Sequence, residues 1–162
     1  MAQQTLHPAE SATKAMVDER RAMSRAAVAG AVAALAGGIA WAVIAVETQS
    51  EIGYVATAIG LLAGLAVHVS TRKHRGLLSQ RDWMRLRAVA VASAALGIAV
   101  GRYLFFDLDH GGFSPGVSQI KMVGYFFRML PQTLKPVDGI WLALAVTAAW
   151  TITRLSELRR LR

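Results

Sequence analysis

The chain has 162 residues, of which 54% are hydrophobic and 17% are charged, whereas soluble domains carry roughly a quarter of charged residues. A formal net charge of +8 would suit a nucleic-acid binder, but the charges are confined to short stretches between long apolar runs. This pattern indicates a membrane protein whose basic loops lie beside anionic lipid headgroups, with no nucleic-acid partner. The absence of cysteine excludes disulfides and thiolate metal sites.

The N-terminal segment, residues 1–25, is polar and carries three acidic residues, unlike a secretory signal peptide. The apolar run that follows is also longer than the signal-peptide core of about 7–15 residues. We therefore expect a cytoplasmic N-terminal segment ahead of an uncleaved first span. Within it, Thr13 to Ser24 contain no glycine or proline, and we expect a short amphipathic helix there on the cytoplasmic surface.

Four apolar runs approach the length of about 20 residues that a helix needs to cross roughly 30 Å of hydrocarbon. These runs are apolar on all sides and lack the polar face, recurring every 3.6 residues, of a soluble bundle helix. The sequence therefore predicts an all-α fold, a four-helix transmembrane bundle. The membrane domain covers residues 26–155, with spans at about 26–46, 52–69, 88–106 and 137–154, and a basic cytoplasmic tail follows at 156–162.

The connection between the third and fourth spans, residues 107–136, has its own pattern. It opens with a Gly-rich turn, and apolar residues then fall at helical spacing from Ile120 to Leu130, where we expect Pro131 to stop them. This stretch is too short to cross a membrane and too apolar to be freely solvated. The sequence therefore predicts an external amphipathic helix that lies in the membrane interface.

Basic residues predict the orientation of the bundle. The N-terminal segment, the connection between spans two and three and the C-terminal residues from Arg154 onward together hold 14 of the 18 Lys and Arg residues. An even number of spans places all three of these segments on one side of the membrane. Because basic loops stay in the cytoplasm, both termini are predicted to be cytoplasmic.

Small residues recur at every fourth position in the first three spans. Lipid tails are as apolar as leucine, so membrane helices associate where small side chains let their backbones meet. Two interpretations stay open: packing within the bundle, and docking of a second subunit, above all on the first span with its neighbouring row of Ala29, Ala33 and Gly37. The residues assigned to helix packing are Gly30, Ala34, Gly38, Gly60, Gly64, Gly97 and Gly101.

Ionisable residues are few within the spans, and none lies near the membrane centre. Arg102 lies about one turn from the outer end of the third span, where it either snorkels or pairs with Asp107, and the two residues are a candidate ion-pair or partner site. His68 lies near the cytoplasmic end of the second span, within reach of headgroups. Asp107, Asp109 and His110 have the donor types of a divalent-metal site, but no second cluster completes the shell, so we expect no metal and no cofactor.

The sequence lacks nucleophile–base pairs, phosphate-binding loops and paired intramembrane carboxylates, and we therefore do not expect an enzyme. Polar groups that would line a transport path are also scarce in the spans. The function that we expect is a non-catalytic membrane subunit or scaffold that packs against another integral membrane protein or against itself. The alternative is a homo-oligomeric channel or transporter component, since one four-helix protomer has little room for a pore.

Six short stretches within residues 26–155 carry a family resemblance, namely Glu51–Tyr54, Gly60–Val67, Leu96–Ile98, Gly101–Leu104, Asp138–Ala145 and Ala148–Trp150. Together they resemble a type of small bacterial four-helix membrane protein, sometimes fused to zinc-ribbon modules, in which lysine is more usual at the position of Arg102. The resemblance implies four spans and a bacterial origin, and we expect the chain to lie in the inner membrane. It implies no activity, and this chain lacks the cysteines of a zinc ribbon.

Overall fold

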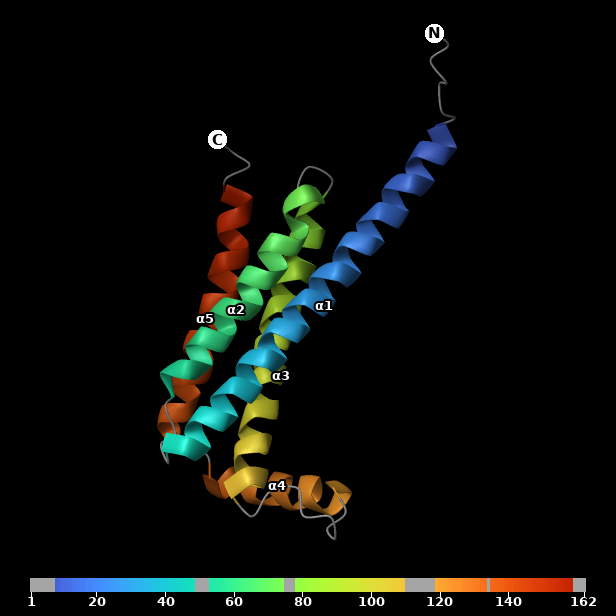
Figure 1. Ribbon diagram of the computed structural model, residues 1–162. Coiled ribbons are helices and arrows are strands. Elements are labelled where there is room, and N and C mark those ends of the chain that lie inside the picture. Colours follow the sequence, from blue (N-terminus) through green and yellow to red (C-terminus); the bar gives the residue numbers. More distant parts are fainter. Residues whose placement is uncertain (1–7, 49–52, 75–77, 110–118, 134, 159–162) are drawn as a thin grey trace.

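The computed structural model describes residues 8–48, 53–74, 78–109, 119–133 and 135–158, and every secondary-structure element in these ranges is helical (Figure 1). The elements are α1 (Pro8–Thr48), α2 (Tyr54–Thr71), the 3-10 helix η1 (Arg72–His74), α3 (Gln80–Asp109), α4 (Gln119–Thr133) and α5 (Pro136–Leu158).

Four long helices form a bundle. α1 packs most extensively against α3, and α2 packs against α5, while α1–α2, α3–α5 and α2–α3 contacts complete the bundle. Each of these four helices contains a stretch long and apolar enough to cross a membrane, namely Met16–Thr48, Tyr54–Thr71, Gln80–Asp109 and Pro136–Arg154. The predicted all-α fold with four candidate spans is confirmed, and the chain has the architecture of a multi-pass membrane protein.

The remaining α-helix, α4, lies across one end of the bundle, roughly perpendicular to the long helices, and packs against α3 (Figure 1). It occupies the stretch for which the sequence predicted an amphipathic helix. The expectation that Pro131 stops this helix is wrong, because the helix continues to Thr133. Near a C-terminus a proline removes one helical hydrogen bond without interrupting a long run, so the last turn tolerates it.

α1 is longer than its membrane span. The separate surface helix predicted over Thr13–Ser24 is instead the first part of one continuous helix of 41 residues. No glycine or proline lies between Pro8 and Gly30, so nothing interrupts the backbone hydrogen bonds there. At 1.5 Å per residue the helix is roughly 60 Å long, about twice the hydrocarbon thickness, and its N-terminal part projects beyond the other helices (Figure 1).

Two helices begin with local capping contacts. Before α3, the Ser79 backbone N–H donates to Asp82 Oδ2 at 2.8 Å, and the Asp82 N–H donates to Ser79 Oγ at 3.3 Å, which is a reciprocal capping box. At α5, Pro136 takes the first helical position, where its missing N–H costs nothing. Asp138 reaches back so that its Oδ2 accepts from the Lys135 N–H at 2.8 Å.

The two ends of the bundle differ in charge. The start of α1, the end of α5 and the facing ends of α2 and α3 lie together at one end, and α4 lies at the other (Figure 1). The first end exposes several basic side chains, and we call it the basic end and the opposite one the α4 end. The exposed arginines of the basic end include Arg72, Arg81, Arg85 and Arg154.

Candidate functional site

Backbone contacts between small residues hold α1 against α3. A Cβ added at Gly97 would collide with the carbonyl oxygen of Ala34, and one added at Gly38 would collide with the carbonyl oxygen of Gly97. A Cβ at Gly101 would lie 2.7 Å from the Gly38 carbonyl oxygen. Because real Cβ atoms do not approach other atoms this closely, only glycine permits this helix separation at these three positions.

The other small residues of the predicted packing set lie in similar contacts. A Cβ at Gly30 of α1 would lie 2.8 Å from Val67 Cγ2 of α2 and 3.1 Å from Ser93 Oγ of α3. Gly60 and Gly64 of α2 face the α5 carbonyl oxygens of Ala145 and Ala149 respectively. All seven small residues that the sequence assigned to helix packing therefore lie in contacts between helices of the same chain.

These contacts bear on the idea that the first span docks a second subunit. Gly30, Ala34 and Gly38 face other helices of their own chain, and Gly37 faces Ile59 of α2. A different face of α1 is not covered by any other helix that the structure describes. It carries a shallow groove of about 600 Å³ lined by Ser24, Arg25, Val28, Ala29, Val32, Ala33 and Ala36.

Arg102 has a different partner from the predicted one. Its Nη2 donates to Asp138 Oδ2 at 3.0 Å, and both side chains are largely buried, with 15% and 19% exposed. The prediction that Arg102 pairs with Asp107 is therefore wrong. The helical turn that separates Arg102 from Asp107 takes the Asp107 carboxylate away from the guanidinium, whereas the start of α5 brings Asp138 beside it.

Asp138 is the site residue that sequence reasoning missed. Its Oδ2 accepts from both Arg102 of α3 and the Lys135 backbone at the start of α5, so one carboxylate joins the two helices. A signal for it was present in the chain. An acid two residues after a proline caps a helix start, and the start of the fourth span lies at the same membrane level as the end of the third.

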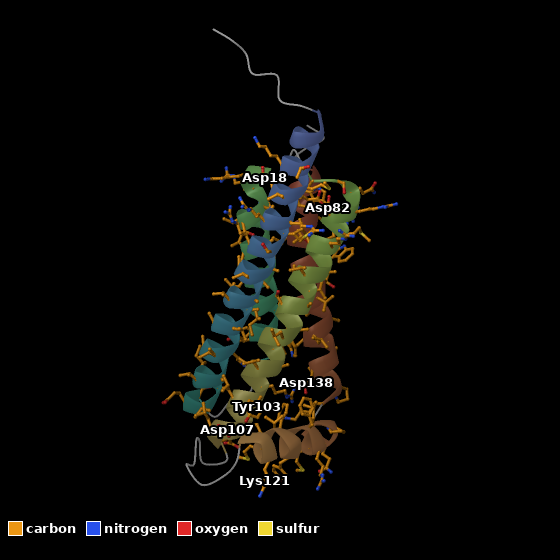
Figure 2. The ribbon with its side chains drawn as sticks, turned by 90° about the vertical axis from the view of Figure 1, so that its right-hand side faces the viewer. Asp18, Asp82, Tyr103, Asp107, Lys121 and Asp138 are labelled. Atoms are coloured by element: carbon orange, nitrogen blue, oxygen red, sulfur yellow. The ribbon has the colours of Figure 1, made fainter. Side chains whose placement is uncertain are left out.

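Asp107 is itself 1% exposed, and neither of its carboxylate oxygens accepts a hydrogen bond from the described residues. It lies at the α4 end of the bundle, near Tyr103 (Figure 2). Tyr103 packs edge-on against Phe126 of α4 with ring centroids 5.5 Å apart, and Phe106 lies 5.6 Å from the same ring. This aromatic cluster fixes α4 against the end of α3.

Two hollows adjoin the Arg102–Asp138 pair. One is a groove of about 500 Å³ between α3, α4 and α5, with an almost entirely apolar lining. The other is a smaller pocket of about 110 Å³, where Trp41 and Gly53 meet the start of α5. Both side chains of the ion pair line both hollows.

The basic end contains a buried cation that the sequence placed among loop charges. Arg87 is 9% exposed, and its guanidinium carbon lies 5.2 Å from the ring centroid of Trp150 on α5. A guanidinium over an indole face is attracted by the ring quadrupole. This contact joins α3 to α5 at the basic end, as the Arg102–Asp138 pair does at the α4 end.

Within the described ranges, no three His, Asp or Glu side chains lie close enough together to hold a metal ion. His110, which the sequence suggested as a ligand beside Asp107 and Asp109, lies outside the described residues. The buried hydroxyls of Thr71 and Thr153 donate to carbonyls of their own helices, at 2.9 and 3.1 Å.

Comparison of the chain with protein-family models, with curated proteins and with solved structures finds no match. The candidate site is therefore defined by the geometry of this chain alone: the Arg102–Asp138 pair, its two hollows and the open face of α1.

Proposed function

We propose that this chain is a non-catalytic subunit or scaffold of a bacterial inner membrane, which packs through α1 against another membrane protein or against a second copy. The N- and C-termini lie in the cytoplasm in this proposal. The bacterial origin rests on the family resemblance, and the orientation rests on the exposed arginines of the basic end.

The observation that carries this proposal is the open face of α1. Val28 and Val32 are 64% and 61% exposed there, and they flank Ala29 and Ala33, which line the groove. Gly30, Ala34 and Gly38 of α1 already pack within the bundle, whereas no helix among the described residues covers this groove. Small residues beside branched ones let a second helix approach closely in lipid, where burying leucine alone gives no driving force.

Single-cysteine crosslinking tests this proposal, because the chain has no cysteine of its own. Val32→Cys, in native membranes, is expected to form an adduct with a partner or with a second copy. The matched control is Ile140→Cys on α5, where the side chain is 60% exposed and outside the groove. Equal adduct formation at the two positions would contradict docking through α1.

Solute flux separates the proposal from the channel or transporter alternative. The purified protein in liposomes is expected to give no selective flux. Selective flux that is lost in Arg102→Ala would instead identify a transport component.

A further inference from the structure

The α4 end carries two adjoining hollows, separate from the open face of α1. The 500 Å³ groove is walled by α3 and α5 and closed at its outer edge by α4. Phe127 of α4 lines it and stays 64% exposed, and Ala95 and Ala99 of α3 form its exposed wall. On the other side of the Arg102–Asp138 pair, the smaller pocket holds Lys135 and Trp141.

The interfacial placement of α4 that the sequence predicts requires that the groove be filled. An amphipathic helix in the membrane interface takes up area that headgroups would otherwise cover. The hydrocarbon beneath it must then come from side chains of the protein or from chains of neighbouring lipids. Phe126 is already buried in the aromatic cluster, and the side chains of α4 line the groove without filling it. Water does not suit an apolar hollow, because it finds no polar partners there.

The shape of the groove selects an acyl chain over a protein helix. α4 lies across the end of the bundle, so a membrane-crossing helix that ran along the groove would collide with it (Figure 1). An acyl chain, by contrast, begins at the headgroup level where α4 lies and extends only toward the membrane centre, so it does not have to pass α4. The hollow of about 500 Å³ is open on one side and almost entirely apolar, which suits part of an acyl chain.

The charged side chains of the smaller pocket favour one kind of lipid headgroup. Lys135 and Arg102 are cations at the smaller pocket, and Asp138 is the one acid among the described residues that line it. The three side chains together carry a net positive charge, which favours an anionic group. Trp141 in the same pocket is a residue type that anchors at the headgroup level.

We propose that the groove and the adjoining pocket bind one anionic phospholipid from the leaflet at the α4 end. One of its two acyl chains lies along Ala95, Ala99 and Phe127, the other stays in the surrounding lipid, and its phosphate lies beside Lys135 and Arg102. The ion pair thus joins α3 to α5 and also separates the chain-binding groove from the headgroup-binding pocket.

Native mass spectrometry of the full chain in mild detergent tests this site, with dioleoylphosphatidylglycerol and dioleoylphosphatidylcholine as probes. The wild type is expected to retain one phosphatidylglycerol molecule per chain. Its retention of phosphatidylglycerol is expected to be about fivefold greater than its retention of phosphatidylcholine, because one cation near an anionic group contributes a factor of this size. Lys135→Gln is expected to remove most of this preference. Ala99→Leu fills the groove and is expected to reduce retention of both lipids several-fold.

Two control variants separate the site from general effects. Lys121→Gln removes an exposed cation on the side of α4 away from the bundle (Figure 2), and Ala143→Leu enlarges an exposed α5 residue outside the groove. Both are expected to bind lipid as the wild type does. If Ala99→Leu does not fold, Ala95→Leu makes the same test from the same wall.

Three results would overturn the proposal. Equal retention of the two lipids by the wild type would exclude charge selection. A loss in Lys121→Gln as large as that in Lys135→Gln would indicate general surface attraction. Unchanged lipid retention with an altered oligomer mass in Ala99→Leu would assign the groove to a protein partner.

Discussion

Arg102 is the residue whose environment explains most about the α4 end. A charged side chain in a span is costly, and it is tolerated near the membrane surface when it has a partner. Here the partner is Asp138, which also caps α5, so both charges are satisfied by groups at the same level. Exposed ion pairs contribute about 0–1 kcal/mol, but this pair is largely buried, and removal of one partner leaves the other poorly solvated.

At the residue scale we predict that Arg102→Ala lowers the free energy of unfolding by about 1–2 kcal/mol, and that Arg102→Lys lowers it less because it keeps the charge. Asp138→Asn is expected to lose a similar amount. The double variant is expected to lose less than the sum, by about 1 kcal/mol, since the two residues share one interaction. Equilibrium unfolding in mixed detergent micelles measures all four values.

The control cycle combines Arg102→Ala with Asp107→Asn. Because the structure does not pair these residues, their losses are expected to add within about 0.5 kcal/mol. Coupling to Asp107 and additivity with Asp138 would reverse the assignment made here.

At the scale of the elements, glycines set the distances between the helices. The α1–α3 contact relies on Gly38, Gly97 and Gly101, where backbone meets backbone, and the α2–α5 contact relies on Gly60 and Gly64. α4 is held differently, because aromatic rings rather than small residues fix it to α3. The spans therefore associate through close backbone approach, and the helix at their end through side-chain packing.

We predict opposite effects for alanine at two mid-helix glycines. Gly97→Ala is expected to lower stability by about 1–3 kcal/mol, because its Cβ would collide with the Ala34 carbonyl oxygen. Gly124→Ala in α4 is the matched control, because among the described residues no atom beyond its own stretch of helix lies within 4 Å of the added Cβ. It is expected to gain up to about 1 kcal/mol from helix propensity. Thermal or detergent unfolding measures both, and a gain in Gly97→Ala would show that the α1–α3 contact is not tight.

At the scale of the whole molecule, the two ends of the bundle differ both in charge and in structure. Most of the exposed arginines gather at the end where α1 begins and α5 ends, whereas α4, with the exposed Arg128, lies at the opposite end (Figure 1). Asp18 and Asp82 lie at the basic end, and Asp107, Lys121 and Asp138 lie at the α4 end (Figure 2). Each end therefore carries charged groups, and the excess of cations at the basic end is the basis of the orientation proposed above.

Labelling from each side of the membrane tests this orientation. Ser79→Cys is expected to react with an impermeant maleimide only in inside-out vesicles, and Lys121→Cys only in intact spheroplasts. Ile39→Cys, half-exposed in the bundle but facing lipid, is the control and is expected to stay unlabelled from both sides. Labelling of Lys121→Cys from the cytoplasmic side alone would invert the topology.

The sequence by itself determined the number of spans, the basic end and the helix at residues 120–130. Hydropathy and charge are properties of each stretch of chain, so they can be read without knowing what the stretch touches. The same reasoning found the small residues, because their spacing is also local. It did not find the length of α1, since helix continuity beyond a span depends on the absence of any break rather than on apolarity.

Only the tertiary structure decided which partners meet. Arg102 pairs with Asp138 rather than with Asp107, and the row from Gly30 to Gly38 faces helices of its own chain rather than a second subunit. The groove between α3, α4 and α5 is likewise formed by residues far apart in the sequence. Periodicity defines the faces of a helix, but the rotation of each helix about its axis and its tilt against its neighbours fix which face meets which, and these follow from packing in three dimensions.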